Sequence, residues 1–212
     1  MPVPDRSGRI TAAGCSNGLT TIPAGADAAR ISDVDGDGKP DTEFYSEGPN
    51  GFEYGIKTSA GGVDTLRDDL AGPGVHSGWT ATVDVAVGHV TVLDDGRSAT
   101  LHAFVGCRFV TTNGPDGQPY RFGLNGFYQA GTGVACSGGN GGVLVEGVLA
   151  HKRRNGNYDI RWTNIDISAD GTKASNGPTS TRWADLAPSD PRVHQAMGSY
   201  CGNIPKVHTN GE

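Results

Sequence analysis

The sequence predicts an all-β, antiparallel protein built as a sandwich, a barrel or a propeller. Hairpin-forming dipeptides recur at short intervals along the 212 residues, with eight Asn-Gly and five Asp-Gly pairs. Such pairs tolerate the positive φ angles that two-residue hairpin turns need. Alternating or β-branched runs lie between the turns, and 34 glycines accompany a hydrophobic content of only 35%. Together these observations favour many short strands over helices.

The predicted strands follow one another with little chain between them. They are Thr42–Ser46, Trp79–Val87, His89–Leu93, Ala99–Val105, Tyr120–Phe127, Val143–Leu149 and Tyr158–Ile167. In Trp79–Val87 every second residue from Trp79 to Val87 is apolar, so these side chains are expected on one face. Asp95-Gly96 separates His89–Leu93 from Ala99–Val105 and predicts a hairpin turn there.

One short helix is predicted near the C-terminus. Asp190 can cap it, Pro191 suits its first position, and Gly198 can end it after Val193–Met197. We expect a single β-rich domain over residues 1–202 and a flexible tail over residues 203–212.

An acidic loop runs from Asp33 to Asp41 and reads Asp-Val-Asp-Gly-Asp-Gly-Lys-Pro-Asp. Its carboxylates occupy positions 1, 3, 5 and 9, and Gly38 at position 6 allows a sharp turn. Like charges at this spacing repel one another unless a cation lies among them, and oxygen ligands of this kind suit Ca²⁺. The expected ligands are four carboxylates and one backbone carbonyl: Asp33, Asp35, Asp37, Asp41 and Lys39.

The acidic loop is not a complete EF-hand, because position 12 is Phe44 where an EF-hand has a bidentate Glu. The residues around Phe44 are β-formers, so we expect the ion at a strand–loop–strand turn. The dissociation constant should be about 0.1–1 mM, as in extracellular modules. A metal-free Asp/Gly turn is the alternative, although such a turn rarely needs four aspartates.

Four cysteines, at positions 15, 107, 136 and 201, predict two disulfides in an oxidising compartment. Three connectivities are possible. We favour Cys107–Cys136 with Cys15–Cys201, because the second bond would tie the two ends of the domain together. Each bond should contribute roughly 3–5 kcal/mol. No Cys-x-x-Cys pair is present, so a zinc knuckle or a thioredoxin-type site is not expected.

Composition narrows the functional classes. The net charge of −6 argues against nucleic-acid binding. No run of residues is apolar and long enough for a transmembrane helix, and Met1–Arg6 is polar and lacks the apolar centre of a leader. We interpret the chain as a mature secreted domain.

The acidic loop resembles the Asp-x-Asp-Gly-Asp-Gly-x-x-Asp loop of FG-GAP and VCBS repeat proteins. Gly131–Cys136 and Asp94–Arg97 are also similar to segments of secreted actinobacterial relatives. The resemblance implies an extracellular β protein, often propeller-like, with Ca²⁺ in hairpin loops and roles in adhesion or ligand binding. A full propeller repeats the acidic loop several times, whereas this chain carries one intact copy. A small propeller-like or sandwich arrangement is therefore expected.

Other residues with reactive or binding chemistry have ordinary structural explanations. Cys15-Ser16-Asn17 lies in a Gly-x-Ser-x-Gly match that lacks the strand and helix of a hydrolase elbow. The basic segment from His151 to Gly156 could bind an anionic ligand, but a solvated hairpin tip is the simpler interpretation. The tryptophans are expected in the core rather than on sugar rings: Trp79, Trp162 and Trp183. An acid pair or a second cation site among Asp64, Asp68 and Asp69 fits no known ligand spacing.

The sequence therefore predicts a secreted, calcium-binding β-domain that acts as a non-catalytic binding or surface-interaction module. Its partner would be an extracellular glycan or a protein. Two alternatives remain open. One is a secreted hydrolase acting on polysaccharide or peptide, for which no acid/base pair stands out. The other is a structural protein that self-associates through strand edges.

Overall fold

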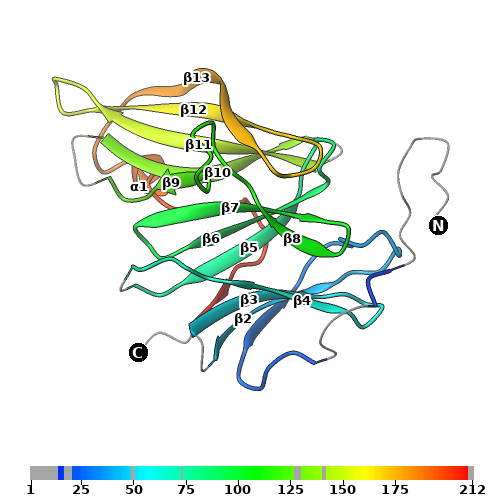
Figure 1. Cartoon of the computed structure of the whole chain (residues 1–212). Coiled ribbons are helices and arrows are strands. Elements are labelled where there is room, and N and C mark those ends of the chain that lie inside the picture. Colours follow the sequence, from blue (N-terminus) through cyan, green and yellow to red (C-terminus); the bar gives the residue numbers. More distant parts are fainter. Residues whose placement is uncertain are drawn as a thin grey trace.

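A computed structural model of the chain describes residues 14–16, 21–48, 51–72, 74–126, 130–139 and 142–209. In this part of the chain nearly all regular structure is antiparallel β, arranged as three sheets that lie in layers (Figure 1). None of the sheets closes into a barrel. The predicted all-β, antiparallel, sandwich-like class is confirmed.

The first sheet is a simple meander in which each strand pairs with the next along the chain. Its strands are β1 (Asp27–Arg30), β2 (Thr42–Gly48), β3 (Gly51–Lys57) and β4 (Val63–Arg67). The pairing of β2 with β3 extends to Gly48, which stands opposite Gly51. This layer carries the acidic loop, which connects β1 to β2.

The middle sheet combines a second meander with the last strand of the chain, in the order β14-β5-β6-β7-β8, and β9 pairs with β7. Its strands are β5 (Ser77–Thr82), β6 (His89–Asp94), β7 (Ser98–Val105), β8 (Arg108–Thr111), β9 (Arg121–Gly123) and β14 (Val207–His208). The Asp95-Gly96 turn joins β6 to β7, as predicted, and Gly96 has φ 79°.

The third sheet is a meander of longer strands, in the order β10-β11-β12-β13. Its strands are β10 (Ala130–Gly139), β11 (Gly142–Lys152), β12 (Tyr158–Ile167) and β13 (Ala174–Leu186). The predicted helix follows as α1 (Pro191–Gln195), whose N-cap Asp190 accepts a hydrogen bond from the backbone N–H of Arg192. The helix packs on the outer face of the third sheet through Val193 and Ala196.

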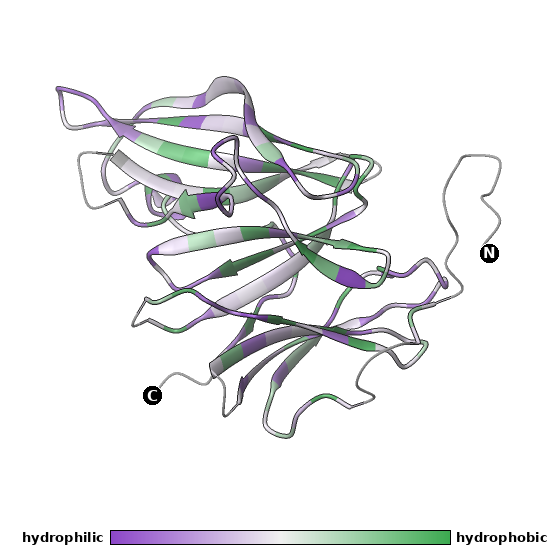
Figure 2. Cartoon of the chain, viewed as in Figure 1, coloured by the Kyte–Doolittle hydropathy of each residue, from purple (hydrophilic) through white to green (hydrophobic). Residues whose placement is uncertain are grey.

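The middle sheet is buried on both faces because it lies between the other two (Figure 1). Successive residues of a strand point to opposite faces, so on β6 Val92 belongs to the core shared with the third sheet and Leu93 to the core shared with the first. Figure 2 shows the hydrophobic stretches along the layered strands and a hydrophilic β11–β12 hairpin tip. The strands of this sheet accordingly bury polar side chains as well as apolar ones, among them Thr80, Thr91 and His102.

The strand predicted over Trp79–Val87 is shorter in the structure. β5 ends at Thr82, and the chain then turns back, with the N–H of Val83 donating to the carbonyl of Gly88 at 2.9 Å. Gly88 adopts φ 88°, which closes this turn into β6. Val83 and Val87 are buried as expected, but Val85 lies at the turn and is exposed.

Both disulfides form, but the favoured pairing is wrong. The bonds are Cys15–Cys107, with Cα atoms 5.5 Å apart, and Cys136–Cys201, with Cα atoms 4.7 Å apart. The observed pairing follows from how the segments that carry the cysteines pack against one another. Cys136 lies on β10, whose Val134 exchanges backbone hydrogen bonds with the segment just before Cys201. All cysteines in the described chain are bonded, which indicates an oxidising environment.

The segment expected as a flexible tail is part of the middle sheet as far as Thr209. β14 pairs with β5, and Val207 is buried in the core between the first and middle sheets. The N–H of Thr209 donates to the carbonyl of His76 at 2.8 Å. Residues 207–209 are thus held by the sheet, and the sequence did not show this because a two-residue strand gives almost no periodic pattern to read. Residues 210–212 lie outside the described chain.

Candidate metal centre

The acidic loop sits at a strand–loop–strand turn, as the sequence predicted. β1 and β2 pair antiparallel on either side of it, and the N–H of Ile31 donates to the carbonyl of Asp41 at 2.9 Å, which closes its base. Gly36 and Gly38 adopt φ values of 77° and 85°, where residues with a Cβ are strained. Glycine is therefore required at positions 36 and 38 for the acidic loop to turn.

Three carboxylates converge in the loop. Asp33, Asp35 and Asp37 each offer an oxygen, and these oxygens lie within 4.8 Å of one another. Asp33 is fixed by the N–H groups of Gly36 and Gly38, each donating at 2.7 Å to a different oxygen of the carboxylate. The side chains are thus oriented by the loop's own backbone before any ligand binds.

Asp41 lies beneath the loop and has a different environment. It is almost fully buried, and its two oxygens accept hydrogen bonds from the N–H groups of Val34 and Ser59, both at 2.7 Å. Burial raises the pKa of Asp41, these two bonds lower it, and the charges of Asp35 and Asp33 raise it again. The repulsion inferred from the sequence is therefore present, and a cation would relieve it.

Lys39 is the predicted ligand that would act through its backbone carbonyl. Lys39 is exposed, and its N–H donates to Asp37 at 2.8 Å. Asp41 is not among the carboxylates whose oxygens converge within 4.8 Å. Asp33, Asp35 and Asp37 are accordingly the residues that the fold brings together.

Two neighbouring segments support the loop, and sequence reasoning missed both. Ser59, in the β3–β4 turn, donates its hydroxyl to Asp37, which lowers the pKa of that carboxyl, assisted by the Lys39 N–H. The N–H of Cys15 donates to Asp35 at 2.7 Å, and the Cys15 carbonyl accepts from the hydroxyl of Thr58 at 2.6 Å. No spacing rule connects these residues, since 22 positions separate Asp37 from Ser59.

The donor set fits a hard cation. Every side-chain group that converges is a carboxylate, and the supporting atoms are backbone amides and hydroxyls. Oxygen ligands of this type suit Ca²⁺ or Mg²⁺, whereas Zn²⁺ and copper prefer imidazole or thiolate. The pre-oriented side chains and the loop's glycines match the requirement of Ca²⁺ for several carboxylate oxygens on a flexible turn.

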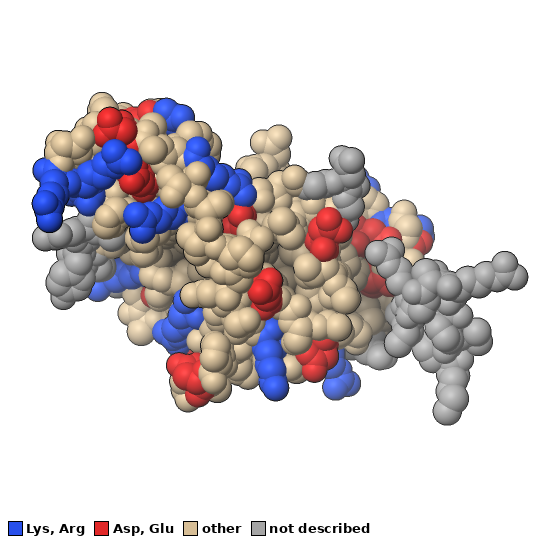
Figure 3. All heavy atoms as spheres, turned by 90° about the horizontal axis from the view of Figure 1, so that it is seen from above, with Lys and Arg blue, Asp and Glu red and all other residues tan. Residues whose placement is uncertain are grey.

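The other residues singled out in the sequence do not assemble into a site. Asp64 accepts a hydrogen bond from the N–H of Phe109 at 2.8 Å, away from Asp68. Trp79 and Trp162 are buried in the core, as expected. In the basic hairpin, Arg153 is paired with Asp159 at 2.7 Å. Figure 3 shows Lys and Arg side chains gathered at one end of the face it presents, with a few acidic side chains among them, and charges of both signs scattered over the rest.

A buried polar layer lies between the first and middle sheets. Asp68 accepts hydrogen bonds from the hydroxyl of Tyr45 and pairs with Nδ1 of His76. The side chains of His76 and Asp68 are only 3% and 1% exposed. A substrate cannot reach a pair this deep, so we assign it a structural role.

A second carboxylate of this layer is Glu43, which is fully buried. It accepts hydrogen bonds from the hydroxyl of Tyr54 and from the N–H of Thr80 at 2.8 Å, while its Oε1 has no hydrogen-bond partner in the structure. Burial raises its pKa to about 8, although the bonds from Tyr54 and Thr80 act in the opposite direction. Glu43 is therefore protonated in the folded chain at neutral pH.

The function is inferred from the chemistry of the acidic loop, because the comparisons with known proteins found no matching protein family, curated protein or solved structure. Among the described residues, no helix combines the length and the apolar character that crossing a membrane requires.

Proposed function

We propose that the chain is a secreted, calcium-stabilised β-module that binds an extracellular glycan or protein without catalysing a reaction. The convergence of Asp33, Asp35 and Asp37 within 4.8 Å carries this proposal. The ion neutralises the three carboxylates, relieves their repulsion of Asp41 and fixes the β1–β2 connection. The resemblance of the loop to FG-GAP and VCBS loops supports Ca²⁺ over other hard cations.

One observation and one expectation support an extracellular location. Both pairs of cysteines are oxidised, which is the usual state of secreted domains and rare in the cytosol. The incomplete ligand set implies a dissociation constant of about 0.1–1 mM, which matches calcium levels outside cells rather than inside. A site of this affinity is filled continuously in an extracellular fluid and serves structure rather than signalling.

Removing two loop carboxylates should abolish the response of the protein to calcium. For the wild type, 10 mM Ca²⁺ should raise the free energy of unfolding by about 1.4 to 2.7 kcal/mol, given the dissociation constant above. This corresponds to a rise in Tm of about 3–10 °C for a domain of this size. For Asp35→Ala combined with Asp37→Ala, thermal unfolding with and without calcium should give the same Tm.

A charge-matched control separates binding from general electrostatics. Asp69→Ala combined with Asp84→Ala removes two exposed carboxylates elsewhere and should keep the full calcium-induced shift. Because Asp35 and Asp37 also accept backbone hydrogen bonds, a second variant with asparagine at both positions retains an acceptor oxygen. A calcium response of wild-type size in the alanine variant would show that the ion is bound elsewhere. The asparagine variant, whose amide oxygens can still coordinate Ca²⁺, should respond more weakly than the wild type.

A further inference from the structure

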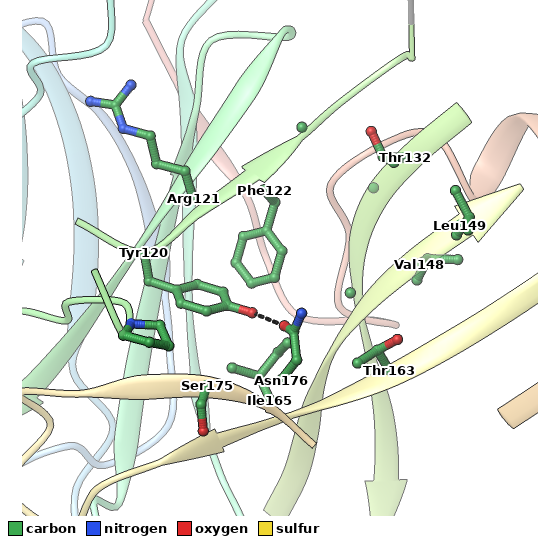
Figure 4. Close-up of a pocket in the computed structure, with 14 residues that line it drawn as sticks. Tyr120, Arg121, Phe122, Thr132, Val148, Leu149, Thr163, Ile165, Ser175 and Asn176 are labelled. Atoms are coloured by element: carbon green, nitrogen blue, oxygen red, sulfur yellow. Dashed lines mark hydrogen bonds between the residues drawn. The ribbon is translucent and has the colours of Figure 1, made fainter. Parts of the chain in front are cut away.

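A cleft opens where the third sheet diverges from β9 and the segment before it. Its volume is about 590 Å³, within the range of small-molecule sites. Figure 4 shows the rings of Tyr120 and Phe122 on one side, and Thr163 and Ile165 of β12 on the other. The cleft lies far from the acidic loop in the fold, on the layer at the opposite side of the middle sheet (Figure 1).

The lining is neutral. Of the described residues around the cleft, Arg121 alone carries a charge, and in Figure 4 its side chain points away from the space. The polar groups that remain are hydroxyls and one amide, contributed by Thr132, Thr163, Ser175 and Asn176. The chain has a net charge of −6, yet no carboxylate of the described residues lines this cleft, so the composition of its lining differs from that of the chain as a whole.

The aromatic side is held in a fixed geometry. The rings of Tyr120 and Phe122 are 5.2 Å apart and meet edge to face. The hydroxyl of Tyr120 donates to the side-chain oxygen of Asn176 across the cleft, as the dashed line in Figure 4 shows. Because the amide oxygen accepts this bond, the amide N–H groups are the part of Asn176 that can donate to a ligand.

Glycine keeps the floor of the cleft open. A Cβ added at Gly147 would lie 3.8 Å from Ile165 and 3.9 Å from the ring of Phe122, which is ordinary van der Waals contact. The position therefore has room for a methyl group that the sequence leaves out. A larger β-branched side chain there would project into the space in front of Phe122, and it suits a strand.

A second hollow extends the cleft. It has a volume of about 620 Å³, is formed mainly by the loop that runs from Gly114 to Pro119, and shares Pro115, Tyr120 and Arg121 with the first. Unlike the first hollow, it has a carboxylate in its lining, that of Asp116. Tyr120 therefore stands between two adjoining spaces. This arrangement accommodates an elongated ligand with more than one ring better than a compact one.

We propose that this cleft binds a neutral oligosaccharide. A sugar ring presents an apolar C–H face that packs on an aromatic ring and hydroxyls that pair with the surrounding hydroxyl and amide groups. In the first hollow, a phosphate, a carboxylate or a charged peptide would lose its hydration to a neutral lining, because the side chain of Arg121 points away from that space. The inference rests on the proposed role as a binding module, for which it names the ligand class, but it does not depend on calcium.

Calorimetric titration with defined oligosaccharides tests the proposal. The probes are neutral hexasaccharides of glucose, xylose, mannose and N-acetylglucosamine, with oligogalacturonate and a heparin fragment as charged counterparts. At least one neutral probe should bind the wild type, and Tyr120→Ala should weaken that binding at least tenfold. Gly147→Val, which fills the floor while leaving the polar groups in place, should weaken it to a similar extent.

The matched control is Leu144→Ala, which truncates an exposed apolar side chain on β11, the strand that also carries Gly147. Its affinity should equal that of the wild type. Circular dichroism of each variant confirms folding, and Gly147→Val alone carries the test if Tyr120→Ala unfolds. The proposal is overturned if no neutral probe binds, if only the charged probes bind, or if the cleft variants bind as the wild type does.

The same samples distinguish failure of the ligand class from failure of the proposed function. Chromatography of the probes after incubation detects any cleavage; a cleaved sugar would disprove the non-catalytic role and leave the sugar site standing. Calcium titration of the sugar-free protein tests the acidic loop by itself. Sugar binding without calcium binding would support the cleft and remove the calcium part of the proposed function.

Discussion

Replacing Cys15 and Cys107 by serine should destabilise the fold and weaken calcium binding together. The bond closes a loop of 92 residues, and its removal should lower the free energy of unfolding by about 4 kcal/mol in the chain-entropy account. For a domain of this size that is a fall in Tm of about 8–16 °C. Urea unfolding in the absence of calcium measures the loss directly.

The effect on calcium follows from the contacts of Cys15. Its N–H orients Asp35, and its carbonyl is held by Thr58 and by the N–H of Gly62 at 2.8 Å. Once the disulfide is absent, this segment is free to leave the acidic loop. The calcium dissociation constant should then rise several-fold, because one of three converging carboxylates loses a fixed orientation.

The second disulfide provides the control. Replacing Cys136 and Cys201 by serine removes a bond across 65 residues and should cost a comparable 4 kcal/mol or so. That bond ties β10 to the chain after α1, away from the acidic loop. Calcium affinity should therefore stay at the wild-type value. Equal loss of affinity in both variants would mean that general instability, and not the position of Cys15, sets the affinity.

Glu43→Gln should stabilise the protein, and the gain should grow with pH. In the folded chain the pKa of Glu43 is raised from 4.5 to about 8, mainly by burial. The folded state thus keeps a proton that the unfolded chain releases near pH 4.5, so stability falls as pH rises towards 8 and then levels. Glutamine cannot ionise, and the variant escapes this loss.

The size of the gain can be bounded. A shift from 4.5 to about 8 corresponds to at most about 5 kcal/mol above pH 8, and we expect about 2 kcal/mol because water entry relaxes buried charges. The measurement is urea unfolding of both proteins from pH 5 to pH 9. Glu47→Gln is the control, since Glu47 lies exposed on the same strand and should give no pH-dependent gain. A difference between wild type and Glu43→Gln that is flat across this range would show that Glu43 is ionised throughout.

Local chemistry made much of the fold predictable from the sequence. The Asp95-Gly96 hairpin, the capped helix at Asp190 and the turn at Gly38 each depend on residues a few positions apart. The same holds for the three converging carboxylates, whose spacing within one loop brings them together. Alternating apolar residues also identified strands such as β6 and β7, because their period is set by the backbone.

Features that depend on how the sheets stack could not be predicted. The pairing of Cys15 with Cys107 requires the first and middle layers to meet at the β7–β8 turn, which no local pattern encodes. Ser59 supports Asp37 because the β3–β4 turn lies beside the β1–β2 loop within the first sheet, which no local pattern encodes either. Asn176-Gly177 suggested a turn but lies inside β13, where an irregular register with β12 accommodates it. The cleft at Tyr120 likewise combines segments that only the layering brings together.

The anchoring of both ends of the described chain to one layer has a mechanical consequence. Cys15 is bonded to the β7–β8 turn, and β14 pairs with β5, so both ends engage the middle sheet. A pull applied between Cys15 and Thr209 is borne first by a covalent bond and by the buried sheet, while the outer layers carry little of the tension. The first sheet lies outside the covalent path that joins these two points through the disulfide, so it is spared this tension while the bond is intact.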